Sequence, residues 1–415
     1  MTEIQARHGQ ADASAPLALG LRRVLLLLFA TGWAGNHFVA TIPVFADTVG
    51  LRATTLDAAF GTYAVGLVPS MMIAGRISDR VGRRNPVLAG ALIAAVGNLL
   101  LLIWHTEFGI LTGRLVIGIG VGIPVGAGSA WATDLAGRRG AVLSGVALSA
   151  GFGAGPLASG ITAQFLPSEY TLLGPFVTTA ALSLGAVALA STVSGVTRAP
   201  APVLAPHHDA ASLSSAVRPQ VTRAVRTAYA SALPLALWVF APATTVFVVL
   251  AARMPAADLG PWAPGLAAAA VLGVGVGVQT ALRIFAWGSW QGTVGIFLAA
   301  AGFAGCALVP PSLSLMAGAT IVLGTAYGMC LREGLLEIER QIPATDRGAV
   351  TAAFYAVAYG FGFGLPVTIR LFEPMLGMPV LLLSLSVLAV LTGALRTQHA
   401  RQARYVRPEE GETDG

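Results

Sequence analysis

The sequence contains no lysine and little charge of either sign. Its 415 residues include 25 basic and 19 acidic side chains, and charged residues make up only 11% of the chain. All 25 basic residues are arginine, which together with the many alanines and glycines indicates a bacterial genome rich in G and C. Hydrophobic residues account for 55%, and the mean hydropathy is +0.74. A soluble domain carries about 25% charged residues, so we expect an integral membrane protein.

The residues that several kinds of chemistry require are also missing. The two cysteines, Cys306 and Cys330, lie in apolar runs, so we expect no disulfide framework. The glycine runs Gly118–Gly122 and Gly273–Gly277 lack a preceding strand and a Gly-Lys-Ser/Thr sequence, which favours helix packing over nucleotide binding. Adjacent histidines at 207–208 have no further spaced ligands. We therefore expect no metal, no cofactor, no ATP, no nucleic-acid partner and no enzymatic activity.

Apolar runs dominate the rest of the chain. A helix needs about 20 residues to cross the hydrocarbon core, because the core is about 30 Å thick and a helix rises 1.5 Å per residue. The runs that meet this length are about 23–45, 56–75, 86–104, 108–132, 141–163, 171–195, 227–251, 263–282, 292–310, 312–331, 348–369 and 375–395. The predicted fold is an all-α integral membrane protein with twelve transmembrane helices.

The positions of the arginines predict the topology. With a cytoplasmic N-terminus, 21 of the 25 arginines fall inside, Arg52, Arg253 and Arg370 fall outside, and one lies within a span. The positive-inside rule requires much less asymmetry than this. No cleavage site follows the first apolar run, so we expect it to be retained as helix 1. The sequence therefore predicts a bacterial inner-membrane protein with both termini in the cytoplasm.

Internal repeats divide the chain into two halves. Arg139–Val142 recurs as Arg347–Val350, and the glycine-rich stretch Gly151–Gly155 recurs as Gly360–Gly364, each about half the chain length later. Such repetition predicts two six-helix halves in the same orientation. The expected parts are a disordered N-terminus 1–20, a first half 21–195, a cytoplasmic linker 196–226 rich in proline, alanine and serine, a second half 227–396 and a disordered tail 397–415.

The most specific motif follows the second apolar run. Residues Gly75–Arg84 are similar to the Gly-x-x-x-Asp-Arg-x-Gly-Arg-Arg/Lys signature of the major facilitator superfamily, and the twelve-helix plan extends this resemblance over essentially the whole chain. The resemblance implies that Asp79 faces the start of helix 11. The matching loop of the second half keeps Arg283 but has no acid, so a charge-based latch would be built from the first half. The residues expected to act in this motif are Gly75, Asp79, Arg80, Gly82, Arg83 and Arg84.

Two further motifs resemble the exporting branch of that family, the proton antiporters. The stretch Gly151–Gly160 is similar to Gly-x-x-x-Gly-Pro-x-x-Gly-Gly, with Ser159 in place of one glycine, and its expected working residues are Gly151, Gly155 and Pro156. Arg114 begins a stretch similar to the family's Arg-x-x-x-Gly-x-Gly, for which the resemblance implies proton coupling. A glycine-rich packing face and a snorkelling structural arginine are the respective alternatives.

Helix 1 lacks the membrane-embedded carboxylate that drug–proton exporters of the family often carry. His37 is the one group near mid-span that can change its charge near neutral pH, and helix counting places it near the depth of Arg114. A lone membrane histidine is equally often a hydrogen-bonded helix contact. The candidates for proton coupling are His37, Arg114, Asp57 and Asp134.

The predicted function is secondary active transport of a small amphipathic compound (drug, antibiotic or metabolite) by alternating access, as proton-coupled export. An uptake symporter or a sugar or metabolite permease of the same fold is the alternative, and a receptor without transport is disfavoured because there is no soluble domain. We expect a monomer whose partners are the substrate, protons and the lipid bilayer. An aromatic, weakly charged cavity suits neutral, planar or hydrophobic solutes. Its candidate residues are Trp33, Asn36, Trp131, Trp238, Gln279, Tyr327, Tyr355 and Tyr359.

Overall fold

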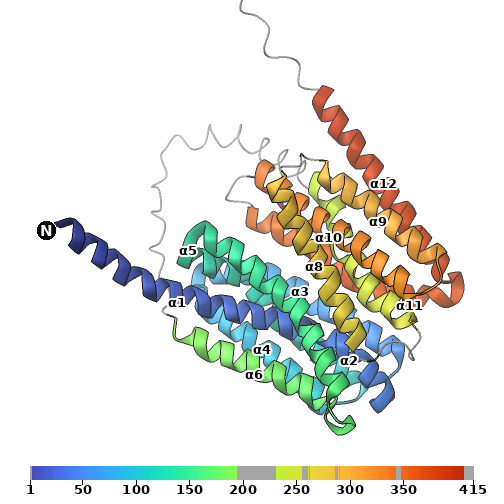
Figure 1. The fold of residues 1–415 in the computed structure, drawn as a ribbon, viewed down its shortest axis with the longest axis horizontal. Coiled ribbons are helices and arrows are strands. Elements are labelled where there is room, and N and C mark those ends of the chain that lie inside the picture. Colours follow the sequence, from blue (N-terminus) through green and yellow to red (C-terminus); the bar gives the residue numbers. More distant parts are fainter. Residues whose placement is uncertain are drawn as a thin grey trace, which may run out of the picture. The chain divides into compact units, whose positions relative to one another are not determined.

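A computed structural model of the chain describes residues 2–193, 230–254, 260, 262–285, 288, 290–342 and 347–405, with side chains from residue 17 onward except 347–349 and 399–405. Within these ranges all regular structure is helical (Figure 1). The α-helices are α1 (Thr2–Asn36), α2 (Phe38–Val44), α3 (Ala53–Val81), α4 (Arg84–Ile103), α5 (Glu107–Phe165), α6 (Leu173–Ser191), α8 (Trp262–Ile284), α9 (Gln291–Leu308), α10 (Leu313–Gln341), α11 (Arg347–Leu376) and α12 (Met378–Tyr405).

Eleven of the described helical segments are long and apolar enough to cross a membrane. One of them, α5, has 59 residues, so it would extend about 88 Å, far more than the hydrocarbon core. Its backbone is not helical at Ala136 and Gly137, where Gly137 has a φ of 54°. The segment therefore supplies two spans, and the prediction of an all-α membrane protein with twelve spans is confirmed.

Several helices are irregular or longer than the apolar runs. The first span breaks at His37 and continues through α2 into the π-helix Phe45–Val49. The seventh span, Ala230–Arg253, also contains a π-helix, at Thr245–Leu250. Residues 17–20 are helical, whereas the predicted linker 196–226 and most of the predicted tail 397–415 fall outside the residues whose side chains are described.

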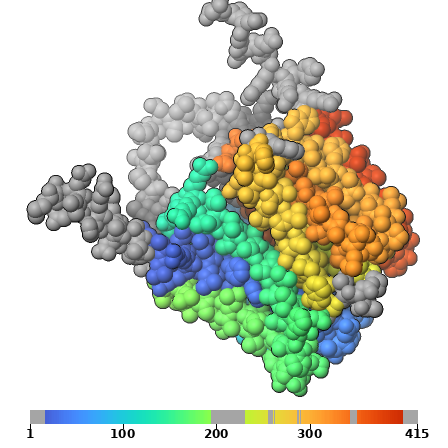
Figure 2. All heavy atoms as spheres, in the orientation of Figure 1, coloured from blue at the N-terminus to red at the C-terminus, as the bar shows by residue number. Residues whose placement is uncertain are grey.

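The chain folds into two compact units. Unit 1 comprises 1–208, 244–273 and 363–370, and unit 2 comprises 209–243, 274–362 and 371–415. In unit 1, α5 packs against α1, α3 and α4, and α6 packs against α1 and α4 (Figure 1). Figure 2 shows α1, α5 and α6 side by side on one face. In unit 2, α9 packs against α10 and α12. The units differ from the predicted halves because the seventh span, α8 and α11 each contribute to both, so the half boundaries stay a prediction.

Close helix contacts in unit 1 depend on glycine. A Cβ atom added at Gly118 of α5 would lie 2.2 Å from the Tyr63 carbonyl oxygen, and one added at Gly66 of α3 would lie 2.4 Å from that of Leu115. The two backbones therefore touch, and no side chain fits between them. Helices in lipid associate largely through such close packing, so this contact holds α3 and α5 in register.

Candidate transport site

Arg114 lies at the centre of unit 1 and is only 1% exposed. Its Nε atom donates to the Ala59 carbonyl oxygen at 3.3 Å, and its Nη1 atom donates to the Gly35 carbonyl oxygen at 3.1 Å. Its guanidinium carbon lies 4.8, 5.9 and 4.3 Å from the ring centres of Phe38, Phe60 and Tyr63, respectively. Carbonyl oxygens and aromatic faces both attract a cation. Residues of α1, α2 and α3 thus enclose the charge of α5.

His37 occupies the break between α1 and α2 and is fully buried. Its Nε2 atom lies 2.6 Å from Asn98 Oδ1, and the Asn98 amide nitrogen donates to the Ala94 carbonyl oxygen at 2.9 Å. This arrangement makes Nε2 the donor and leaves Nδ1 without a partner among the described residues. The ring also packs edge-on against Phe176. His37 therefore ties the first span to α4 and α6, and its role in coupling stays a prediction.

The antiporter-like motif of α5, Gly151–Gly160, packs closely against the backbone of α1. A Cβ atom added at Gly151 would lie 2.0 Å from the Phe29 carbonyl oxygen, and one added at Gly155 would lie 2.8 Å from that of Trp33. Pro156 cannot donate to the carbonyl of Phe152 four residues earlier. Instead Asn36 Nδ2 donates to this oxygen at 2.7 Å. At this motif the backbones of α1 and α5 are in direct contact, and we call this contact the α1–α5 joint. The side chain of Asn36 provides the hydrogen bond that Pro156 removes from α5.

The signature loop forms an ionic chain within unit 1. Arg83 lies 2.5 Å from Asp79 and 3.6 Å from Asp134 of α5, and it donates to Ser78 at 2.7 Å. Gly82 has a φ of 89°, which residues with side chains rarely adopt. A Cβ atom added at Gly75 would meet its nearest neighbour only at 3.9 Å, so this glycine does not mark a close helix approach.

The other arginines of this loop lie apart from its carboxylates. Arg80 is exposed, whereas Arg84 donates to the Ser191 carbonyl oxygen at the end of α6. The contact predicted for Asp79 falls on the start of α11, whose side chains at 347–349 lie outside the described residues. The latch therefore stays a prediction.

Three of the predicted cavity tyrosines come together in unit 2. Tyr359 of α11 stacks on Phe240 with ring centres 4.4 Å apart, and it also stacks on Tyr355 at 6.0 Å. Tyr327 of α10 lies 5.9 Å from the same phenylalanine. Phe240, which connects these tyrosines, was not among the predicted cavity residues. Gln279 of α8 is half-buried.

The predicted tryptophans have other neighbours. Trp238 is fully buried, packs against Phe303 and donates to Thr392 Oγ1 of α12 at 2.9 Å. Trp33 donates to Thr179 Oγ1 of α6 at the same distance. Trp131 belongs to the hydrophobic core of unit 1, and its indole nitrogen has no partner among the described residues. Their contribution to a substrate cavity stays a prediction.

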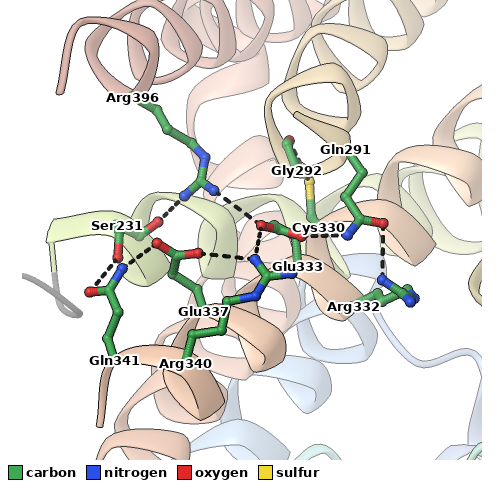
Figure 3. A network of polar contacts seen from close by, with 10 residues as sticks. All are labelled: Ser231, Gln291, Gly292, Cys330, Arg332, Glu333, Glu337, Arg340, Gln341 and Arg396. Carbon is green, nitrogen blue, oxygen red and sulfur yellow. Dashed lines mark hydrogen bonds and ion pairs between the residues drawn. The ribbon is translucent and has the colours of Figure 1, made fainter. Parts of the chain in front are cut away.

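A polar network that the sequence analysis did not predict lies in unit 2 (Figure 3). At its centre Glu333 of α10, 0% exposed, accepts from Gln291 of α9 at 2.5 Å and from Arg340 at 3.1 Å, and lies 3.8 Å from Arg396 of α12. Arg340 also lies 3.7 Å from Glu337. One buried carboxylate therefore links α9, α10 and α12. The spacing of 333, 337 and 340 is the signal, since residues four and seven positions apart share a helix face.

At the other end of the spans, α3 and the unit 1 section of α11 are linked by charge. Arg370 Nε donates to Asp57 Oδ2 at 2.6 Å. Just before α3, Arg52 forms an ion pair with Glu107, and the hydrogen bond to this carboxylate raises the pKa of the Arg52 guanidinium. The coupling candidate Asp57 therefore has an arginine partner.

This architecture matches a known family over most of its length. A profile of the Major Facilitator Superfamily matches residues 24–395. The chain belongs to the major facilitator superfamily. The resemblance drawn from the Gly75–Arg84 motif is thus confirmed, and membership of this family of transporters agrees with the prediction that the chain is not an enzyme.

Curated relatives of this superfamily member match over a limited stretch. Across 98 residues the chain is 36% identical to "Multidrug resistance protein MdtL" of Klebsiella pneumoniae (strain 342) and 32% identical to the MdtL protein of Shewanella oneidensis. The matched stretch is 24% of this chain and 24% of each relative. The chain therefore spans about a quarter of the length of these relatives.

Solved structures share the superfamily fold. The nucleoside transporter NupG superposes with a TM-score of 0.68 at 15% identity, covering 92% of this chain and 99% of that one. A POT family transporter in complex with 5-aminolevulinic acid gives 0.73 at 11% identity, with coverage of 92% and 96%. The human organic anion transporter MFSD10 gives 0.63 at 18%, with coverage of 92% and 99%. At these identities the similarity establishes the fold.

Proposed function

We propose that this superfamily member is a secondary transporter that exports small amphipathic compounds from the bacterial cytoplasm in exchange for protons. The observation that carries the proposal is the joint between α1 and α5. At Gly151 and Gly155 the two backbones touch without interlocking side chains, and Pro156 removes one helical hydrogen bond. Such a contact lets helices pivot on each other. The similarity to multidrug resistance proteins supports drug-like substrates and outward transport.

Movement in this proposal occurs by alternating access, with the seventh span, α8 and α11 as the elements that bend. Each of these helices contributes residues to both compact units, so each must deform if the units move. Within unit 1, the ion pair between Asp57 and Arg370 holds α3 to the 363–370 section of α11 in one state. In the opposite state Asp79 latches the cytoplasmic side against the start of α11.

Proton coupling is assigned to His37, with Arg114 as a fixed charge that opposes its protonation. Arg114 contacts Gly35 and Phe38, which lie within two residues of His37 in the sequence, and like charges in a poorly solvated site repel strongly. Protonation is therefore favoured when the site opens to water on the outside. The three tyrosines around Phe240 supply aromatic contact area for the substrate.

The test measures flux in both orientations. A host that expresses the chain is screened for reduced susceptibility to a panel of antibiotics and dyes, and active compounds are then offered to membrane vesicles with an imposed pH gradient. Export predicts accumulation in inside-out vesicles that a protonophore abolishes. Accumulation only in right-side-out vesicles would establish uptake instead. Accumulation that is the same with and without the protonophore would contradict proton coupling. Vesicles with the well-inserted Gly155→Leu protein are the matched control.

A further inference from the structure

Among the described residues Arg114 has no acidic partner, although the buried carboxylates of that part of the chain have basic ones. Among the described residues no carboxylate forms an ion pair with Arg114, which contacts two carbonyl oxygens and three aromatic rings. Four carboxylates with side chains less than a fifth exposed all lie beside an arginine, at 2.6, 3.6, 3.1 and 3.7 Å: Asp57, Asp134, Glu333 and Glu337. A cationic substrate would have to displace an arginine from each of these acids.

Keeping an unpaired cation in a membrane protein is costly. A charged side chain inside a bilayer normally pairs with another charge or faces a binding site. Aromatic faces and carbonyl oxygens compensate the charge of Arg114 only in part, because none of them carries a full negative charge. The site is therefore electrostatically complementary to an anion.

A second polar group at this position also lacks a partner. The Tyr63 hydroxyl is buried and makes no hydrogen bond with any described residue. It lies at Gly35, where an added Cβ atom would be 2.8 Å from the hydroxyl oxygen. Gly35 is also the residue whose carbonyl oxygen accepts from Arg114 Nη1. A hydroxyl donor and a guanidinium thus meet at a residue that has no side chain, and a buried unsatisfied polar atom of this kind calls for a ligand or water.

Access to this position depends on α11. Phe363 stacks on Phe60, with ring centres 6.1 Å apart and an angle of 7°, and it meets Tyr63 edge-on at 5.6 Å. These two rings are among those that enclose Arg114. The same section of α11 is held to α3 by the ion pair between Asp57 and Arg370. Separation of α11 from α3 would therefore uncover Tyr63 and Phe60, two of the three rings that cover Arg114.

We propose that Arg114 and Tyr63 bind the acidic group of the substrate, and that the exported compounds are amphipathic organic anions such as aromatic carboxylates or sulfonates. The inference rests on the proposed transport function and adds the substrate class to it. An oxygen pair on one acidic group can accept from both the guanidinium and the hydroxyl, and hydrogen bonds to charged partners are the stronger kind. The aromatic part of the substrate then replaces the ring of Phe363.

The experiment uses three fluorescent probes that share one aromatic group and differ in charge. Dansylglycine is an anion, dansylamide is neutral and dansylcadaverine is a cation. Binding to the purified full-length protein is measured by fluorescence, and flux is measured in inside-out vesicles. We expect dansylglycine to bind at least about tenfold more tightly than dansylcadaverine, the difference that one hydrogen bond to a charged group can supply. Arg114→Gln should remove this preference.

Smaller changes keep the test independent of folding. Tyr63→Phe removes only the hydroxyl and should weaken dansylglycine binding several-fold while dansylamide binding stays unchanged. Arg114→Lys should retain part of the preference for the anion. The matched control is Arg52→Gln, which removes a positive charge from a side chain that is 74% exposed and paired with Glu107, and it should leave all three affinities unchanged.

The outcomes separate this inference from the transport function. Tighter binding of dansylcadaverine, no binding of dansylglycine, or dansylglycine affinity that is unchanged in folded Tyr63→Phe and Arg114→Lys proteins would overturn the anion site. Binding that follows these expectations without flux of any probe would support the anion site and contradict transport. Flux of the cation alone would support transport and reject the anion site.

Discussion

The joint at Pro156 allows a quantitative test, because a side chain of α1 replaces a hydrogen bond that α5 cannot make. Asn36 Nδ2 donates to the Phe152 carbonyl oxygen at 2.7 Å. In Asn36→Leu this oxygen loses its donor while Pro156 still cannot supply one. In the double variant with Pro156→Ala, the new backbone N–H can donate to Phe152, so the loss of Asn36 should matter much less.

The expected size of the effect follows from the surroundings of the bond. Leaving a buried polar atom unsatisfied costs about 1–3 kcal/mol in soluble proteins, but interhelical hydrogen bonds in membrane proteins average about 0.6 kcal/mol and reach about 1.7. Phe152 has no alternative partner in its own helix, so the upper part of the membrane range applies. We expect Asn36→Leu to lower the free energy of unfolding by about 1–2 kcal/mol, and by less than about 0.5 in the Pro156→Ala background.

The assay is a double-mutant cycle on detergent-solubilised protein, with reversible denaturant unfolding followed by circular dichroism. The coupling energy between positions 36 and 156 is the quantity of interest, since it cancels the packing change that Leu introduces. A matched control cycle pairs Pro156→Ala with Thr31→Val, because the Thr31 hydroxyl donates to the Leu27 carbonyl oxygen of its own helix and has no hydrogen bond to another helix among the described residues. Equal losses from Asn36→Leu in both backgrounds would refute the reasoning, because Asn36 would then not replace the proline's missing donor.

Three further predictions concern charge. Asp79→Asn should strongly reduce transport while membrane insertion stays intact, and full transport by well-inserted protein would end the latch hypothesis. His37→Gln should remove the pH dependence of flux between about 5.5 and 7.5, a range that brackets the ordinary histidine pKa; wild-type pH dependence would make His37 a structural contact and direct attention to Asp57 and Asp134. Glu333→Gln should lower stability by about 1–3 kcal/mol, because the nearly buried Arg396 loses its charged neighbour, whereas the half-exposed Arg340 keeps Glu337; the measurement is chemical denaturation, with exposed Glu169→Gln as the control.

The number and approximate limits of the spans were predictable because the thickness of the bilayer fixes how long an apolar run must be. The direction in which each side chain points was less predictable. The sequence places Trp238 and Tyr327 near mid-span, but Trp238 contacts Phe303 and Thr392, whereas Tyr327 joins the cluster around Phe240. The depth of a residue in the membrane follows from counting along its helix. The direction of its side chain also depends on how the helix is rotated about its axis. The π-helical turns, as at Thr245–Leu250, shift that phase without a clear sequence signal.

Motif residues were recognised more reliably than their contacts. Arg114 was identified from its motif and from the cost of a membrane-embedded charge, but its partners come from α1, α2 and α3, which one sequence cannot place around it. Asn36 was chosen as a cavity residue for its polarity. Its bond to Phe152 could have been anticipated only by asking which carbonyl Pro156 leaves without a donor. Counting the backbone groups that a proline frees is therefore a useful addition to motif searches.

Each unit has a polar contact between two consecutive helices, and the two contacts use different side chains. In unit 1, Arg83 precedes α4 and reaches Asp134 of α5. In unit 2, Gln291 begins α9 and reaches Glu333 of α10. The repeat places an amide where the first half has arginines, so the loss of acid in the second loop does not remove the polar link between these helices. Glu333 is buried and also contacts arginines of α10 and α12. The second link is therefore formed between helices and does not depend on a loop. In unit 1, Arg83 also pairs with Asp79, whose side chain is 61% exposed, and this exposed pair is the one that a conformational change can break at low cost.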